Sequence, residues 1–199
     1  MSKEIKYILA SGSPRRKEIL TRLKIPFTVM VSEADETHGS EAAEQIVMKL
    51  AQRKAQAVAE ELSGSEECVI IAADTLVSLD GKVLGKPKDR ADAERMVRSI
   101  SGRTHQVFTG VALIHMPGGE QRVFYERTDV HVKELSEEEL HAWVDSGGGD
   151  DKAGAYAIQG AFGVHIRAIE GDYDNVVGFP AARFEKELKE FLKEAGSDE

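Results

Sequence analysis

The sequence has little cysteine and no long apolar run, and these absences exclude several classes of protein. Cys68 is the only cysteine among 199 residues, which excludes an intramolecular disulfide and a zinc site built from several cysteines. No stretch is as long and apolar as a membrane span, and the N-terminal apolar run is shorter than the core of a signal peptide. We therefore expect a soluble, cytoplasmic protein with no membrane partner.

Positive charge and aromatic side chains are also scarce. The chain has 26 Lys and Arg residues against 35 Asp and Glu residues, a formal net charge of −9, and only 6% of its residues are aromatic. Nucleic acids bind basic surfaces, and single strands stack on aromatic rings. We therefore expect no nucleic-acid partner, and any site for an anion must be local.

Several familiar signatures are missing as well. The sequence contains no Walker A loop, no GxGxxG and no GxSxG, and its six histidines lack the spacing of metal ligands. Carboxylates are the only plentiful ligands, so a metal, if one is used, should be Mg²⁺ or Mn²⁺. The acidic loop that carries Glu33, Asp35 and Glu36 could supply such ligands, although a solvated acidic loop has the same composition.

The sequence does contain strands and helices that alternate without a linker. Apolar runs predict strands at 5–10, 26–31, 68–74 and 163–171, and two long strands within 105–132 that a Pro-Gly-Gly turn joins. Helical patterns follow Ser13 and cover 41–62, 89–100, 136–146 and 181–196. This order predicts one mixed α/β domain over residues 1–199, folded as two lobes around a cleft.

Two arginines stand where a helix normally avoids positive charge. Ser13 is a good N-cap and Pro14 a good first helical residue, which places Arg15 and Arg16 in the first turn. The helix dipole opposes each charge there by roughly 0.3–1 kcal/mol, a cost that two solvated surface arginines tolerate. A phosphate at this helix end would also explain them, with Ser11 adding a hydroxyl donor.

Lys54 and Asp74 are two more charged residues in apolar surroundings. Lys54 falls in the apolar stripe of the 41–62 helix, where its stem could snorkel to solvent or its amine could reach into a cleft. Asp74 follows the run CVIIAA, so we expect it at the carboxyl end of a buried strand, where open α/β sheets bind ligands; a turn aspartate is the alternative. Lys86 lies nearby in a Gly-Lys-Pro turn. The residues alone thus favour a cleft for a phosphorylated small molecule.

Five motifs over residues 9–180 resemble, in their order, those of the Maf family of nucleoside triphosphate pyrophosphatases. They read LASGSPRRKEIL, AADTLVSLDGKVLGKP, SGRTHQVFTGVAL, DKAGAYAIQG and GDYDNVVGFP. The resemblance implies an elongated mixed-sheet fold like that of inosine triphosphatase, with a deep cleft between two lobes. It also implies hydrolysis of a nucleoside triphosphate to the monophosphate and pyrophosphate with Mg²⁺ or Mn²⁺.

The resemblance also assigns roles to residues. Asp74 corresponds to the proton acceptor, and Glu33 and Asp74 to the acidic residues that hold the metal. The residues implied to bind the phosphates are Ser11, Arg15, Arg16, Lys54 and Lys86.

Three positions set the substrate in this family, and here they are Arg15, Thr75 and Gln159. The combination resembles the subgroup that acts on dTTP and UTP, as opposed to the one that acts on 7-methyl-GTP. The Gln159 amide has a donor and an acceptor, which suit the O4 and N3–H edge that uracil and thymine share. The family name leaves a second interpretation open, a regulator that inhibits septum formation through a partner. Members of this family often dimerise, so the resemblance is compatible with a homodimer, although no feature of the sequence requires one.

Overall fold

A computed structural model describes residues 5–31, 33–62 and 67–196 of the chain. Its strands are β1 (Lys6–Leu9), β2 (Phe27–Val29), β3 (Cys68–Leu79), β4 (Lys82–Leu84), β5 (Thr104–Met116), β6 (Gln121–Val132) and β7 (Ile166–Glu170). Its α-helices are α1 (Pro14–Arg22), α2 (Ala43–Leu62), α3 (Arg90–Ile100), α4 (Glu137–Asp145), α5 (Tyr173–Val177) and α6 (Ala181–Ala195). Two 3₁₀ turns, η1 (Ala153–Ala155) and η2 (Ala161–His165), precede β7.

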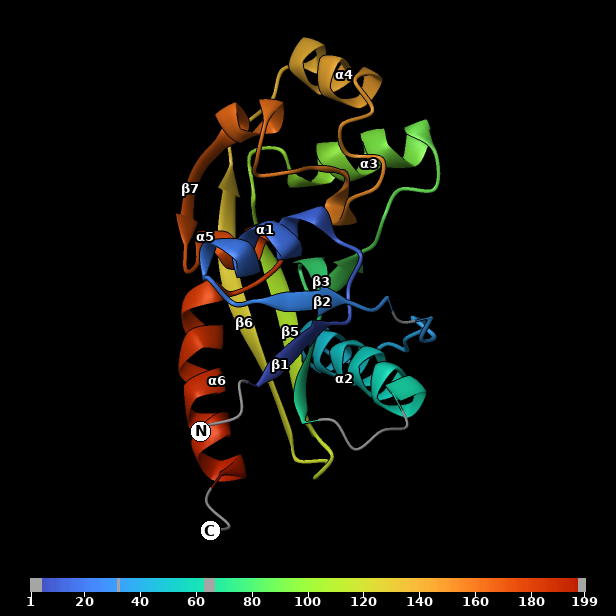
Figure 1. The fold of residues 1–199 in the computed structure, drawn as a ribbon. Helices are drawn as coiled ribbons and strands as arrows, with labels where there is room; N and C mark the ends of the chain where they lie inside the picture. The colour runs from blue at the N-terminus through green and yellow to red at the C-terminus, as the bar shows by residue number, and fades with distance from the viewer. Residues whose placement is uncertain (1–4, 32, 63–66, 197–199) are drawn as a thin grey trace.

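All seven strands join one mixed sheet, which confirms the predicted α/β class. The order is β2-β1-β3-β5-β6-β7, with β4 paired to β3. β1 runs parallel to β2 and β3, whereas the other pairs are antiparallel. Because β3, β5 and β6 are long, the molecule is elongated, with α3 and α4 at the end away from the two termini (Figure 1).

The alternation of side chains along β3 builds two layers of core. Ile70 and Ala72 pack with α2 residues on one face, while Val69 and Ile71 pack with residues of α1 and α6 on the other. Farther along, Val77 and Leu79 join a separate core with α3 and α4. A strand buried on both faces must be apolar throughout, which explains the continuous run in the sequence.

β3 has two different partners along the same edge. β1 pairs with it as far as Ile71, and β4 pairs with it from Val77 onward. Among the described residues, 72–76 have a strand partner only on the other side, from β5. The prediction that Asp74 ends its strand is therefore wrong, because pairing with β5 and then β4 continues β3 to Leu79. What ends at this level is the parallel neighbour β1.

The ends of the helices and of β7 agree only in part with the local sequence signals. Ser136 and Glu139 form the capping box of α4, with Ser136 N–H donating to Glu139 Oε2 over 2.8 Å. Ser13 does occupy the N-cap of α1, but its side chain makes no capping bond. The predicted strand at 163–171 is shorter, because η2 takes its first residues and β7 spans only Ile166–Glu170.

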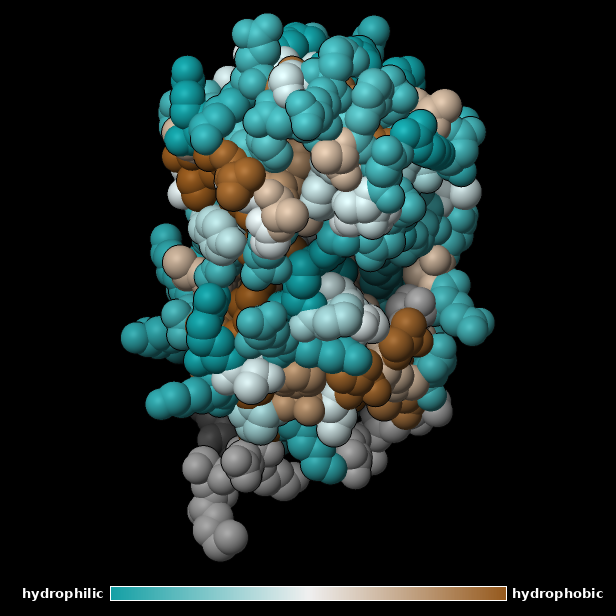
Figure 2. All heavy atoms as spheres, turned by 90° about the horizontal axis from the view of Figure 1, so that it is seen from above, coloured by the Kyte–Doolittle hydropathy of each residue, from teal (hydrophilic) through white to brown (hydrophobic). Residues whose placement is uncertain are grey.

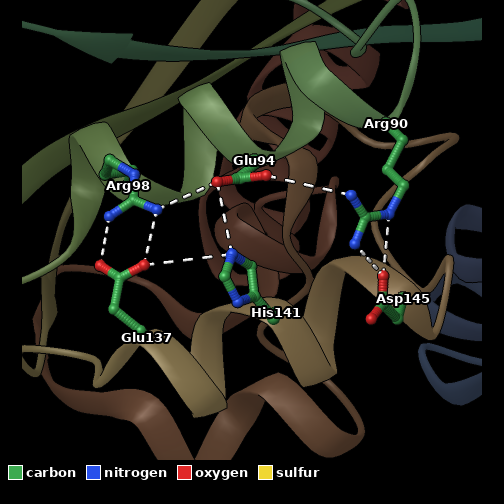
Figure 3. Close-up of polar contacts among 6 residues, drawn as sticks. All are labelled: Arg90, Glu94, Arg98, Glu137, His141 and Asp145. Carbon is green, nitrogen blue, oxygen red and sulfur yellow. Dashed lines mark hydrogen bonds and ion pairs between the residues drawn. The ribbon is translucent and has the colours of Figure 1, made fainter.

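An exposed network of ion pairs links α3 to α4 (Figure 3). Arg98 Nη2 lies 3.0 Å from Glu94 Oε1 on its own helix and 2.9 Å from Glu137 Oε2 on α4. His141 Nε2 lies 3.4 Å from Glu94 Oε1. Exposed pairs of this kind contribute about 0–1 kcal/mol each. Met96 and Val97 belong to the apolar core beneath these ion pairs, and this core holds this end of the molecule together.

Helix α2 lies unusually close to the sheet at Gly110, the β5 residue that pairs with Asp74. A Cβ built on Gly110 would lie 2.4 Å from the backbone carbon and oxygen of Val47. Backbone atoms at that distance cannot move aside without shifting the helix. Gly110 therefore sets how closely α2 approaches Asp74.

We predict that Gly110→Ala lowers the free energy of unfolding by about 1–3 kcal/mol, because α2 must move away from β5. Urea denaturation measures the loss. Gly85→Ala is the matched control, since a Cβ there meets nothing within 4 Å. Equal stability of the two variants would contradict the close packing at Gly110.

Candidate active site

A cavity of about 830 Å³ lies beside residues 72–76 of β3. Its walls come from the 10–16 segment after β1, from α2, from the turn around Lys86 and from residues 151–159. Elsewhere the surface seen from above is mostly hydrophilic, with its hydrophobic residues in small separate patches (Figure 2). No helix in the described part of the chain has the length and apolar character to cross a membrane.

Asp74 and Thr75 line this cavity from opposite faces of the sheet. Asp74 points to the α2 side, where it meets Lys54, and Thr75 points to the α1 side, where it meets Arg16. Successive side chains in a strand always diverge in this way. Both reach one cavity because neither β1 nor β4 covers the edge of β3 between them. The cavity wraps around that edge.

Arg16 is already engaged with protein acceptors. Its Nη1 donates to Ser11 Oγ over 3.1 Å, its Nη2 to Thr75 Oγ1 over 3.2 Å and its Nε to the Gly178 carbonyl over 3.0 Å. Burial lowers the pKa of Arg16, and the nearby Asp74 carboxylate opposes that shift. Arg16 therefore fixes the positions of Ser11 and Thr75 at the floor of the cavity.

Arg15 differs from Arg16 in its hydrogen bonding. It also lines the cavity, but its Nε is buried and has no hydrogen-bond partner among the described residues. A buried donor without an acceptor costs about 1–3 kcal/mol. An anionic ligand in the cavity would supply that acceptor. The structure thus brings both predicted arginines and Ser11 together, with Arg15 the one left free for a ligand.

Lys54 points into the cavity and does not snorkel to bulk solvent. Its Nζ lies 2.6 Å from Asp74 Oδ1 and 2.8 Å from Glu36 Oε1. The Lys54 hydrogen bond lowers the pKa of Glu36 below its usual value. Lys54 and Asp74 are both largely buried, with side chains 13% and 12% exposed, so their pairing offsets much of the cost of burying each charge.

The acidic loop contributes a different residue from the one the resemblance implied. Glu33 is exposed and is not among the residues that line the cavity. Glu36, three residues later, lines it and contacts Lys54. The sequence placed both glutamates in one loop after β2, and only the path of that loop over the cavity distinguishes them.

Lys86 and Gln159 complete the predicted set at the rim of the cavity, where both are exposed. Their segments are joined by a hydrogen bond from Gly154 N–H to the Gly85 carbonyl, 3.0 Å long. The bond connects the turn after β4 to the segment before η2. Residues far apart in the sequence, from Ser11 to Gln159, therefore surround one space.

A family model described as Maf-like protein matches residues 6–191. The chain belongs to the Maf family. A relative from Bacillus cytotoxicus is 50% identical over 187 residues, 94% of this chain and 95% of the relative, and is named dTTP/UTP pyrophosphatase. A relative of the same name from Bacillus mycoides is 50% identical over 188 residues, and one from Bacillus anthracis is 48% identical over 187; each match covers 94% of this chain and 95% of the relative.

The carboxylates of this Maf protein fit a hard divalent cation. Oxygens of Asp74 and Glu36 converge on one ammonium nitrogen, and carboxylate oxygens are the ligands that Mg²⁺ and Mn²⁺ prefer. Among the described residues no group of three or more His, Cys, Asp and Glu side chains could hold a metal. Mg²⁺ commonly binds through one or two carboxylates and substrate phosphates, so two carboxylates suffice.

Sequence reasoning missed Tyr156, which lines the cavity, and His105, which is buried behind it. The Tyr156 hydroxyl lies 2.7 Å from His105 Nε2, and the buried His105 Nδ1 has no hydrogen-bond partner in the part of the chain that the structure describes. Trp143 Nε1 donates to the carbonyl of Ala155 over 2.9 Å. These bonds anchor the segment that leads to Gln159. His105 and Tyr156 both lie in the family motifs, but only the fold shows that they meet.

Burial lowers the pKa of His105 to about 4, because its charged form would lose its hydration. The unfolded chain, with a histidine pKa near 6.5, takes up that proton first as the pH falls. We therefore predict that His105 destabilises the folded protein by about 2–3 kcal/mol between pH 7 and pH 4.5. Urea denaturation across this range should show a shallower loss in His105→Gln than in the wild type. Parallel curves for the two proteins would contradict the prediction.

Proposed function

We propose that the protein is a nucleoside triphosphate pyrophosphatase that converts dTTP and UTP to their monophosphates and pyrophosphate. The observation that carries the proposal is that Asp74, three of the predicted phosphate-binding cations and the substrate-linked residues Thr75 and Gln159 line one cavity. The cations are Arg15, Lys54 and Lys86. The names of the Bacillus relatives support the same activity and the same substrates.

Charge neutralisation and positioning are the main requirements of this reaction. Water attacks the α-phosphorus, the bond to the bridging oxygen breaks, and pyrophosphate leaves. Arg15 and Lys86 hold the phosphates, and Asp74 orients the water and accepts its proton. Asp74 and Glu36 would hold Mg²⁺ or Mn²⁺, which would supply neutralisation of phosphate charge and a lower pKa for the attacking water. Arg16 acts indirectly, through its bonds to Ser11 and Thr75.

The base is selected by Gln159 at the rim. Its amide can accept from N3–H and donate to O4 of uracil or thymine. A base with another pattern would leave these groups unpaired, which discriminates strongly in a site built for hydrogen bonding. The exposed position of Gln159 leaves it free to meet the base.

Asp74→Asn should lower kcat by about 10²–10⁴-fold while nucleotide binding is largely kept, because the amide cannot accept the proton. The assay incubates purified protein with dTTP, UTP, CTP, GTP or 7-methyl-GTP and Mg²⁺ or Mn²⁺, and it resolves pyrophosphate from orthophosphate. Lys49→Met, on the outer part of α2, is the control with an intact cavity. Near-normal turnover by Asp74→Asn would remove Asp74 from the proposed role, and preference for 7-methyl-GTP would overturn the subgroup.

Gln159→Glu should lower kcat/KM for dTTP and UTP by about 10–100-fold, because a carboxylate cannot donate to O4 and repels it. Activity on the other triphosphates of the panel should change far less, since the phosphate contacts are intact. An unchanged substrate profile would disprove base recognition by Gln159.

Three further features remain predictions. The resemblance is compatible with a homodimer, and the composition favours a cytoplasmic location and no nucleic-acid partner. The metal, Mg²⁺ or Mn²⁺, is the part of the proposal that the carboxylate pair supports most directly.

A further inference from the structure

Lys54 occupies the position at which the two cavity carboxylates converge. Its Nζ lies within 2.8 Å of both Glu36 Oε1 and Asp74 Oδ1, although these residues come from a loop and from a central strand. Two carboxylates that face one point repel each other unless a cation lies between them. In the protein without a nucleotide, Lys54 provides that cation.

A divalent cation and this ammonium group cannot bind the same two oxygens together. Mg²⁺ requires its oxygen ligands at about 2.0–2.1 Å, so it would have to take the place of Nζ. The two cations also repel each other at such separations. Metal binding at Asp74 Oδ1 and Glu36 Oε1 therefore requires Lys54 to move away from these two oxygens.

A bound nucleotide would provide Lys54 with an alternative partner in the cavity. Its side chain is flexible, with three rotatable donors, and it shares the cavity with Arg15 and Lys86. A triphosphate held by those cations brings phosphate oxygens within reach of the amine. The move from carboxylate to phosphate then keeps the ammonium paired throughout.

We propose that Lys54 is an internal counter-ion that blocks the divalent-metal position in the free protein and gives it up when a triphosphate binds. The inference rests on the proposed function, because it requires a triphosphate and a metal in this cavity. By linkage, nucleotide and metal must then strengthen each other's binding. The free protein avoids holding a metal next to Asp74 when no substrate is present.

The test is a titration of the nucleotide-free protein with Mn²⁺ alone, with free Mn²⁺ followed by electron paramagnetic resonance. Lys54→Met should bind Mn²⁺ at least about tenfold more tightly than the wild type, within the range of typical coupling between sites. The control is Lys49→Met, which removes the same charge from the same helix at an exposed residue that pairs with Glu41. Its affinity should equal that of the wild type.

Two more variants show that the gain belongs to this site. Glu36→Gln added to Lys54→Met should remove the gain in affinity. Lys54→Gln, which retains a hydrogen-bond donor toward Asp74, should show the same gain as Lys54→Met and replaces that variant if it fails to fold. Mn²⁺ affinity that is equal to or weaker than wild type in the folded Lys54 variant would overturn the inference.

The outcome is separable from that of the proposed function. Pyrophosphate release by the wild type tests the activity, whereas the Mn²⁺ titration uses no nucleotide. Release of pyrophosphate without tighter Mn²⁺ binding in the Lys54 variants would refute the counter-ion alone. Tighter Mn²⁺ binding by those variants, with no pyrophosphate released by the wild type, would refute the activity. It would still support a divalent-metal position that Lys54 blocks.

Discussion

The exposed edge of β3 between its two partners is the constraint on which the rest of the site depends. β1 ends at Leu9 and β4 begins to pair at Val77, so residues 72–76 face the cavity edge-on. At that edge, side chains from both faces of the sheet can reach one ligand. Asp74 and Thr75, although adjacent and oppositely directed, can therefore act on the same molecule.

The elements around this edge supply charges of opposite sign at short range. The turn from β1 into α1 brings Arg15 and Arg16, while α2 brings Lys54 against Asp74 because Gly110 lets the helix lie close to β5. The chain as a whole carries a net charge of −9, so the positive character of the cavity is local. Such a site attracts a phosphate-bearing ligand without making the whole surface attractive to nucleic acid.

Much of the fold and part of the site could be predicted because the relevant signals are local. The periodicity of α2 and the apolar run of β3 identify their elements directly. Arg15, Arg16, Lys54 and Asp74 could be singled out because each conflicts with its sequence neighbourhood. Glu36 could not be separated from Glu33, because the path of a loop depends on contacts far away in the sequence.

The sequence by itself determined the alternating elements, the mixed α/β class and the residues whose charges have no local explanation. The tertiary structure decided which of them meet. In it, Arg16 donates hydrogen bonds to Ser11, Thr75 and Gly178, and Lys54 lies between two carboxylates. Arg15 Nε has no partner within the described ranges. The physical reason is that the periodicity of a helix or strand depends on residues close together in the sequence. These contacts depend instead on where β1 ends beside β3.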